Sequence, residues 1–322
     1  MTILLVGPPP NQYATIGAAM ADALVGDVIQ LVNGYINETV PVTKNDLTIN
    51  GGGSSTGIVL HLASGIAAIT LTGTAPINVF DHPGTANTIA GNDGNNVITV
   101  SGGVDTVSGG QGTDRLIVDY SLSTVATTLD SVSGGGSALG TVTIGSGFEN
   151  FTFLTGSGDD TLTTGDGDDV INSGDGTDYI SAGAGKNTII TGYGADTITA
   201  GDGNNVITTG DGADTITTGD GNNVISSGAG ATTVSTGDGN NVISVGDGAD
   251  TITTGDGDNM ISAGDGANTI TTGNGNDTID TGIGADTITS GAGNAQITVR
   301  GGIDTVTAGT GNDRLIINRP VA

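Results

Sequence analysis

Residues 192–218 read GYGADTITA, GDGNNVITT and GDGADTITT, three successive units of nine residues that each open on a G-x-G element. The same register extends outward in both directions, so that eighteen units run without insertion from Gly156 to Ile317. A fixed period of this kind is the signature of a solenoid. We number the positions of each unit 1 to 9, with Gly156 at position 1 of the first unit.

Each unit has a turn half and a strand half. The glycines at positions 1 and 3 permit positive φ and close approach of the backbone, and the T-I-T type segment that follows is rich in β-branched residues, which favour strands. By alternation position 7 points inward, and it is aliphatic in every unit from Leu162 to Ile297. The sequence therefore predicts that one thin aliphatic stack forms the core.

Two units make one coil of 18 residues, because units of the G-x-G-A-D-T-I-T type alternate with units of the GDGNNVI type. Position 5 therefore forms two columns, one along each edge of the solenoid. The column that we name the Asp edge consists of Asp160, Asp178, Asp196, Asp214, Thr232, Asp250, Asn268, Asp286 and Asp304. The other column, the Asn edge, consists of Asp169, Asn187, Asn205, Asn223, Asn241, Asn259, Asp277, Ala295 and Asp313.

The two edges are predicted to differ in chemistry. Stacked coils lie about 4.8 Å apart, so a column of Asp side chains without counter-charge repels itself, and a cation between successive turns is the natural remedy. Oxygen ligands without His or Cys select Ca²⁺ over zinc or copper. Stacked Asn side chains need no cation, since they form a hydrogen-bonded ladder.

The composition supports cation binding and excludes several other classes of function. The 322 residues include 60 Gly and 34 acidic side chains against six Lys plus Arg, a formal net charge of -28, and all the acidic residues except Glu38 and Glu149 are Asp. Binding to nucleic acid or to an anionic membrane is excluded, because it requires clustered basic residues. There is no Cys for a disulfide or a thiolate site, and no apolar stretch approaches the length of a membrane span.

The Asp residues at position 5 are the candidate calcium ligands, together with Asp105 and Asp114 of a shorter repeat block. Those of the long array are Asp160, Asp169, Asp178, Asp196, Asp214, Asp250, Asp277, Asp286, Asp304 and Asp313. We interpret Asp residues at position 2 as solvated or auxiliary ligands. These secondary candidates are Asp166, Asp175, Asp202, Asp211, Asp220, Asp238, Asp247, Asp256 and Asp265.

The array resembles the calcium-binding repeats of the repeats-in-toxin (RTX) family, whose nonapeptide G-G-x-G-x-D-x-U-x folds into a parallel β-roll. The segment TGDGADTIT from Thr209 to Thr217 matches all of this pattern except the first Gly. The resemblance implies that Asp carboxylates and turn carbonyls of neighbouring coils share several Ca²⁺ ions, and that the Asp edge holds them. The replaced first Gly and the Asn edge depart from the family pattern, so the occupancy of the Asn edge stays open.

The resemblance also implies an extracellular or cell-surface location. The expected route is type I secretion without a cleaved signal peptide, in which the chain stays unfolded at low calcium and folds in millimolar external calcium. Only Asn318 to Ala322 follow the repeats, whereas exported members of the family usually carry a longer C-terminal secretion region.

Outside the long array we predict four further segments. Residues 1–90 are expected to form a β-helix-like section with a capping helix at 13–24, similar to the opening of right-handed β-helix proteins of the pectate-lyase type. Residues 91–118 form the short repeat block, 119–155 a β-strand insert, and 318–322 a tail after the β-roll of 156–317. The GGVDTV and GGIDTV elements, each followed by DRLI, end the two repeat blocks and are interpreted as closing each roll.

The fold class is therefore all-β, a right-handed parallel β-solenoid with one N-terminal helix, and the expected function is structural. We expect a surface-layer, matrix, adhesion or filament subunit, with self-assembly or a cell-surface polysaccharide as possible partners. No catalytic residue is predicted, because the carboxylate pairs at 159–160 and 168–169 lie inside the repeats and His61 alternates as a strand residue.

Two alternatives stay open. The first is an ice-binding solenoid, because outward Thr pairs such as Thr215 with Thr217 resemble the flat Thr arrays of some antifreeze solenoids, although Tyr179 and Ser181 interrupt the array. The second is an accessory β-helix enzyme or carbohydrate-binding module.

Overall fold

A computed structural model describes residues 1–318, and in it the chain folds as an all-β parallel solenoid with one short helix, which confirms the predicted fold class. The chain divides into a compact N-terminal unit, Met1–Thr155, and a C-terminal unit that begins at Gly156. In the described part no helix has the length and hydropathy of a membrane span. Of the predicted tail at 318–322, Asn318 ends the last strand and residues 319–322 lie outside the described residues.

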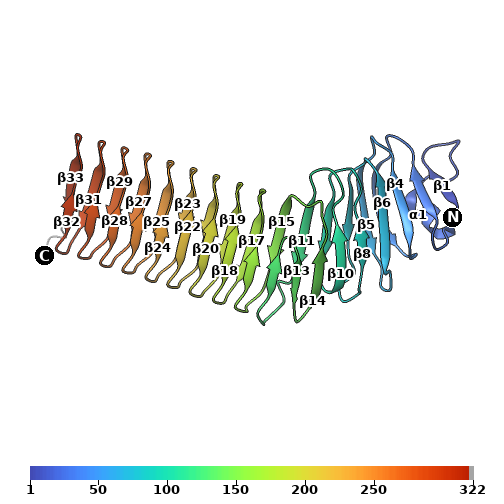
Figure 1. The fold of residues 1–322 in the computed structure, drawn as a ribbon, viewed down its shortest axis with the longest axis horizontal. Helices are drawn as coiled ribbons and strands as arrows, with labels where there is room; N and C mark the ends of the chain where they lie inside the picture. The colour runs from blue at the N-terminus through green and yellow to red at the C-terminus, as the bar shows by residue number, and fades with distance from the viewer. Residues whose placement is uncertain (319–322) are drawn as a thin grey trace. The chain divides into compact units, whose positions relative to one another are not determined.

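The C-terminal unit consists of coils that each contribute one strand to each of two parallel sheets (Figure 1). Sheet A contains β16 (Thr161–Thr163), β18 (Tyr179–Ala182), β20 (Thr197–Ala200), β22 (Thr215–Thr218), β24 (Thr233–Ser235), β26 (Thr251–Thr253), β28 (Thr269–Thr271), β30 (Thr287–Thr289) and β32 (Thr305–Thr307). Sheet B contains β17 (Val170–Gly174), β19 (Thr188–Thr191), β21 (Val206–Thr208), β23 (Val224–Ser226), β25 (Val242–Val245), β27 (Met260–Ala263), β29 (Thr278–Thr281), β31 (Gln296–Arg300) and β33 (Arg314–Asn318).

The 18-residue coil fixes the register of both sheets. Ile198 pairs with Ile216 in sheet A, and Ile207 pairs with Ile225 in sheet B, so each residue lies beside its equivalent in the next coil. The position 7 side chains from Leu162 to Ile297 are at most 2% exposed. The predicted aliphatic stack is thus confirmed as the core between the two sheets.

The turns are so tightly stacked that some glycines cannot be replaced. Gly194 has φ of 148°, and a Cβ atom added to it would overlap the carbonyl oxygen of Gly176 in the preceding coil. The glycines of position 3 therefore allow neighbouring turns to approach closely, as the sequence pattern indicates.

The N-terminal unit is built on the same principle with less regular coils. One sheet stacks the parallel strands β1 (Ile3–Val6), β2 (Val28–Leu31), β4 (Leu47–Gly51), β6 (Ala68–Gly73), β8 (Thr88–Ala90), β10 (Gly103–Ser108) and β14 (Gly140–Ile144). The other sheet stacks β3 (Ile36–Val42), β5 (Thr56–Leu62), β7 (Ile77–Phe80), β9 (Val97–Val100), β11 (Arg115–Asp119) and β15 (Asn150–Leu154).

The helix α1 (Ile16–Asp22) is shorter than the predicted segment 13–24. It begins at Ile16 because the Thr15 side chain accepts a hydrogen bond from the backbone N–H of Ala18, and Tyr13 instead bridges to Val6. The buried residues Ile16, Ala19 and Met20 form its inner face, which packs against β1, β2 and β3.

The insert 119–155 consists of β-strands, two of which depart from the parallel order of the solenoid. Its strands β12 (Thr128–Asp130) and β13 (Gly134–Ser137) pair antiparallel, and β13 also pairs antiparallel with β14, so a small meander interrupts the parallel order. The interpretation of the first DRLI element as the end of a roll is wrong, because β11 pairs with β9 on one side and with β15 on the other.

Candidate metal centre

The position 5 side chains of the Asp edge lie inside the corners of the coils. Alternation along the chain points positions 5, 7 and 9 inward, and the side chains of Asp178, Asp196 and Asp214 are each 1% exposed. Burial of an ionised carboxylate is unfavourable unless every oxygen has a partner. The partners of the two carboxylate oxygens therefore decide what this column requires.

One oxygen of each carboxylate is bound by the protein itself. The backbone N–H of Asp178 donates to Oδ1 of Asp196 at 2.9 Å, and the backbone N–H of Asp196 donates to Oδ1 of Asp214 at 3.0 Å. Further along the edge, the N–H of Thr232 donates to Oδ1 of Asp250 at 2.8 Å. These hydrogen bonds connect neighbouring coils, and each of them uses one carboxylate oxygen.

In three corners of the Asp edge the second carboxylate oxygen is buried without a hydrogen-bond donor. This is the case for Oδ2 of Asp214, Asp250 and Asp286, whose side chains are each 1% exposed. Such an oxygen loses its hydration and gains nothing in return, which costs about 1–3 kcal/mol for a neutral group and more for a charged one. The Asp edge is consequently incomplete as a purely protein structure.

On the Asn edge the position 5 side chains form hydrogen bonds both to the next coil and to their own turn. Nδ2 of Asn223 donates to Oδ1 of Asn241 at 3.0 Å and to the carbonyl oxygen of Gly221 at 3.1 Å. Nδ2 of Asn205 likewise donates to Oδ1 of Asn223 and to the carbonyl oxygens at positions 1 and 3 of its own turn. The predicted Asn ladder is confirmed, and it also satisfies the turn carbonyls.

Asn268 places the same arrangement on the Asp edge. Its Nδ2 atom lies 3.1 Å from the carbonyl oxygen of Gly264 and 3.4 Å from that of Gly266. Asp250 and Asp286 occupy the equivalent position with a carboxylate in place of the amide, and their Oδ2 atoms have no donor. A carboxylate cannot donate a hydrogen bond to the turn carbonyls as Asn268 does, so a cation or a proton would be needed to satisfy both groups.

Electrostatics support this description. Burial raises the pKa of Asp178, Asp196 and Asp250 above the ordinary value, although the Ser173 hydroxyl beside Asp178 and the Thr191 hydroxyl beside Asp196 act in the opposite direction. A raised pKa means that the ionised carboxylate is disfavoured in this environment unless a positive charge accompanies it.

The short repeat block repeats the arrangement in the N-terminal unit. Oδ1 of Asp105 accepts the backbone N–H of Asn87 at 2.9 Å, Oδ1 of Asp114 accepts that of Asn96 at 2.6 Å, and both Oδ2 atoms are buried without a donor. Burial raises the pKa of Asp105 to about 7 and that of Asp114 to about 6. Each of these two Asp residues thus has a buried carboxylate oxygen without a hydrogen-bond donor, as on the Asp edge.

The remaining predicted ligands fall into distinct environments. Asp160 and Asp169 are buried, and both oxygens of the buried Asp277 already accept hydrogen bonds, Oδ2 from the Thr272 hydroxyl at 2.7 Å. Asp304 is half-buried and Asp313 is exposed in the last coil. The structure thus separates the ten position 5 candidates of the long array, which the sequence pattern treated alike.

The secondary candidates at position 2 lie on the surface of the turns. Oδ1 of Asp202 accepts the backbone N–H of Asp220 at 2.9 Å, and Oδ1 of Asp220 accepts that of Asp238 at 2.8 Å. Their outer oxygens face solvent, in contrast to those of position 5. The full set is exposed: Asp166, Asp175, Asp202, Asp211, Asp220, Asp238, Asp247, Asp256 and Asp265.

Within residues 1–318 no three acidic or His side chains converge on one point. A cation at the Asp edge would therefore have to combine carboxylate oxygens with backbone carbonyls and water, which suits Ca²⁺ with its six to eight oxygen ligands. The turn carbonyls at positions 1 and 3 are candidate cation ligands that the pattern of side chains does not identify. Asn residues at position 5 locate them, because the Asn amide donates hydrogen bonds to these carbonyls.

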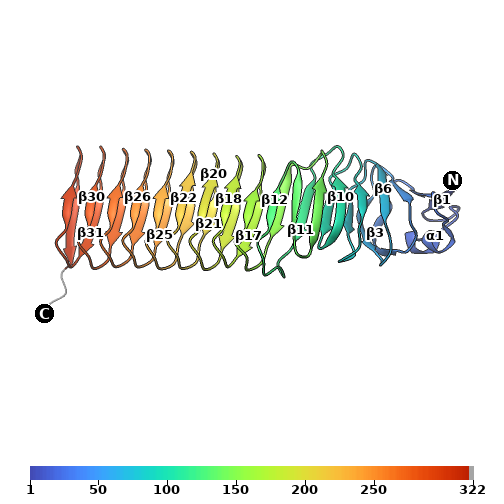
Figure 2. The same cartoon turned by 60° about the horizontal axis from the view of Figure 1, so that its bottom comes forward.

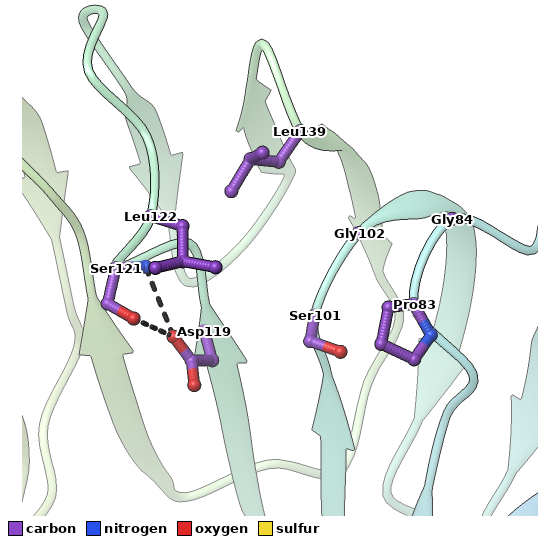
Figure 3. Close-up of a pocket in the computed structure, with 8 residues that line it drawn as sticks. All are labelled: Pro83, Gly84, Ser101, Gly102, Asp119, Ser121, Leu122 and Leu139. Carbon is purple, nitrogen blue, oxygen red and sulfur yellow. Dashed lines mark hydrogen bonds between the residues drawn. The ribbon is translucent and has the colours of Figure 1, made fainter.

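The N-terminal unit also contains a pocket of about 410 Å³ (Figure 3). Leu122 and Leu139 flank it, and its serine hydroxyls are engaged: Ser121 donates to Asp119 at 2.6 Å, and Ser101 donates to Asp81 at 2.9 Å. Asp119 is the one titratable side chain among the eight that line it. The lining thus offers no pair of acid and base for catalysis.

A family model described as the RTX calcium-binding nonapeptide repeat matches residues 84–116 and, in overlapping copies, residues 154–316. These matches cover more than half of the chain and include both the Asp edge and the short repeat block. No curated protein matches the chain.

Proposed function

The chain belongs to the family of RTX calcium-binding nonapeptide-repeat proteins, and from this premise we propose that it is a structural protein of the cell exterior whose Asp edge binds a row of Ca²⁺ ions. The observation that carries the proposal is the row of buried Oδ2 atoms without donors, as in Asp214, Asp250 and Asp286. The residues fit the ion, because their free ligands are all hard oxygen atoms.

The protein's own residues supply most of the interactions in the proposed calcium-dependent folding. The core stack and the Asn edge hold the coils in register, while Oδ1 of each Asp binds the backbone of the preceding coil. Bound Ca²⁺ supplies positive charge beside the second carboxylate oxygen. In a calcium-poor compartment the Asp edge stays repulsive, so calcium binding is coupled to folding.

We propose that the folded solenoid acts without catalysis, as a surface-layer, matrix, adhesion or filament subunit. The family supports an extracellular place of action, where millimolar calcium allows folding after export by a type I route. Regular parallel coils give a long surface on which a cell-surface polysaccharide or another copy of the chain finds repeated contacts.

The test is a calorimetric titration of the chelated protein with Ca²⁺, and in parallel with Mg²⁺. We expect several Ca²⁺ ions to bind per chain and Mg²⁺ to bind far more weakly, because Mg²⁺ demands octahedral geometry and gives up water reluctantly. Absence of calcium binding at millimolar concentration would overturn the proposal.

A further inference from the structure

The outer surface of sheet A carries a regular array of side chains in six successive coils. Positions 4, 6 and 8 point outward there and present one Ala and two hydroxyl side chains per coil. We name this surface the Thr face; its rows are Ala195–Thr197–Thr199, Ala213–Thr215–Thr217, Ala231–Thr233–Ser235, Ala249–Thr251–Thr253, Ala267–Thr269–Thr271 and Ala285–Thr287–Thr289.

The rows are aligned by the backbone. Thr215 pairs with Thr233, and Thr233 pairs with Thr251, so each position forms a straight rank across the sheet. Figure 2 shows the strands β20, β22, β26 and β30 of this sheet side by side. All side chains of the Thr face are exposed except Thr197, which is half-buried. Because every strand is hydrogen-bonded on both sides, the spacing of the ranks is fixed.

The Thr face is free of charge, although the chain carries 34 acidic residues. The absence of charge is not a simple result of repeated units, because position 2 of the same six units varies. Its residues are Tyr193, Asp211, Ala229, Asp247, Asp265 and Ile283. The equivalent positions of sheet B contain Lys186, Asp258 and Asp280 among Val, Asn and Ser residues. The uniform, uncharged composition of positions 4, 6 and 8 is thus a property of sheet A and not of sheet B.

The composition of the Thr face is unsuited to several partners. Protein interfaces are anchored by Trp, Tyr, Arg and Met, and Thr and Ser are under-represented among their energetically important residues. Sugar-binding surfaces use aromatic platforms, and the rows of the Thr face contain no aromatic residue; Tyr193 is exposed in the turn beside the first row, and Tyr179 lies one coil before it. Without charge the face offers nothing to anionic or cationic polymers. What it does offer is two ranks of hydroxyls and one rank of methyl groups on a fixed lattice.

We propose that the Thr face binds ice. Its hydroxyls recur about every 4.8 Å across the coils and about every 6.7 Å along each strand, which is twice the rise per residue. In ice, hydrogen bonds of about 2.75 Å at tetrahedral angles place second-neighbour oxygens about 4.5 Å apart and repeat the lattice after about 7.3 Å. Waters bonded to the hydroxyl ranks are held close to these spacings, and the Ala methyl groups beside them stay unhydrated on contact with the crystal.

The test compares matched variants in calcium-loaded protein. Thr233→Lys with Thr251→Lys places two cations in the centre of the Thr face. The control, Val242→Lys with Met260→Lys, makes the same change at position 6 of sheet B in the same two coils. The readouts are the thermal hysteresis gap and the enrichment of protein in a slowly growing ice fraction, with far-UV circular dichroism as the check of folding.

We expect hysteresis and enrichment in ice for the wild type and the control, and loss of both for the Thr face variant with an unchanged dichroism spectrum. The proposal is overturned if the calcium-loaded wild type is excluded from ice, or if the control loses activity to the same extent. Retention on crystalline cellulose or chitin without enrichment in ice overturns it in favour of a polysaccharide ligand. These outcomes leave the calcium proposal untouched, since calcium binding is measured separately.

Discussion

Asp250→Asn is the substitution that isolates the role of one corner of the Asp edge. The variant keeps Oδ1, which accepts the backbone N–H of Thr232 at 2.8 Å, and replaces the unpartnered Oδ2 by an amide nitrogen. The neighbouring coil already contains Asn268 at the same position, so the backbone accommodates the amide without rearrangement. The change therefore removes a buried charge and adds donors in place.

The expected effect in chelator is a gain in stability. Relieving a buried unpaired oxygen is worth about 1–3 kcal/mol, and a new hydrogen bond to a turn carbonyl adds about 1 kcal/mol, so we expect about 2–4 kcal/mol in total. In saturating calcium the gain should disappear, because the variant also loses a cation ligand. The sign of the effect thus depends on calcium.

The mirror substitution is Asn241→Asp on the Asn edge. It deletes the bonds from Nδ2 to the carbonyl oxygen of Gly239 and to Oδ1 of Asn259, both 3.0 Å, and buries a charge. We expect a loss of about 2–4 kcal/mol in chelator, by the same reasoning in reverse. Calcium should restore part of this loss.

The assay is urea unfolding followed by circular dichroism in excess chelator and in millimolar calcium. Where the chelated wild type is too unstable to show a transition, the calcium concentration at the midpoint of folding replaces the urea midpoint. The reasoning is refuted if Asp250→Asn requires as much calcium as the wild type, or if Asn241→Asp requires less.

Further outcomes follow from the same structure. In chelator, stability should be highest below about pH 4, where unfolded Asp is protonated, and should fall as the pH rises through the raised pKa values of Asp114, about 6, and Asp105, about 7; a pH-independent urea midpoint would contradict this. Gly194→Ala should lower stability by about 1–3 kcal/mol or more, because φ is positive and the preceding turn is in contact; thermal unfolding measures it, and an unchanged midpoint would refute the packing argument. Ile216→Ala should cost about 2–5 kcal/mol in the same measurement, and a much smaller loss would mean that the stack is not the core. Asp220→Ala, at an exposed position, should change stability by about 1 kcal/mol at most and leave the calcium midpoint in place; a large shift would assign ligand status to position 2.

The regular half of the fold can be predicted from the sequence because each unit has the same type of residue at the same structural position. Position 7 is aliphatic in every unit and is buried in every unit from Leu162 to Ile297, so periodicity alone located the core. The Asn ladder followed in the same way, because identical amides 18 residues apart in sequence stack directly in space.

Elements without a repeat were harder to place. The start of the helix depended on the cap at Thr15, and the antiparallel strands β12 and β13 are short and rich in Gly, so no alternation of side chains marked their direction. The first DRLI element resembles the last one in sequence, yet β11 is paired on both sides. Local sequence does not encode whether another coil follows.

The candidate metal centre was predicted by residue but not by environment. Asp277 and Asp214 have the same place in the repeat, yet Asp277 accepts a hydrogen bond from Thr272 while Oδ2 of Asp214 has no donor. Both Asp residues follow a Thr at position 9, and the Thr272 hydroxyl donates while the Thr209 hydroxyl has no partner, a difference that the nonapeptide pattern does not specify. Burial and partners in neighbouring coils, rather than residue type, separate the ligands.

The central claim is that the Asp edge needs cations to fold, and far-UV circular dichroism of the chelated chain during a calcium titration at neutral pH tests it most directly. The account predicts a weak strand signal in chelator that rises to saturation as Ca²⁺ is added. A full strand signal in excess chelator, unchanged by calcium, would contradict it.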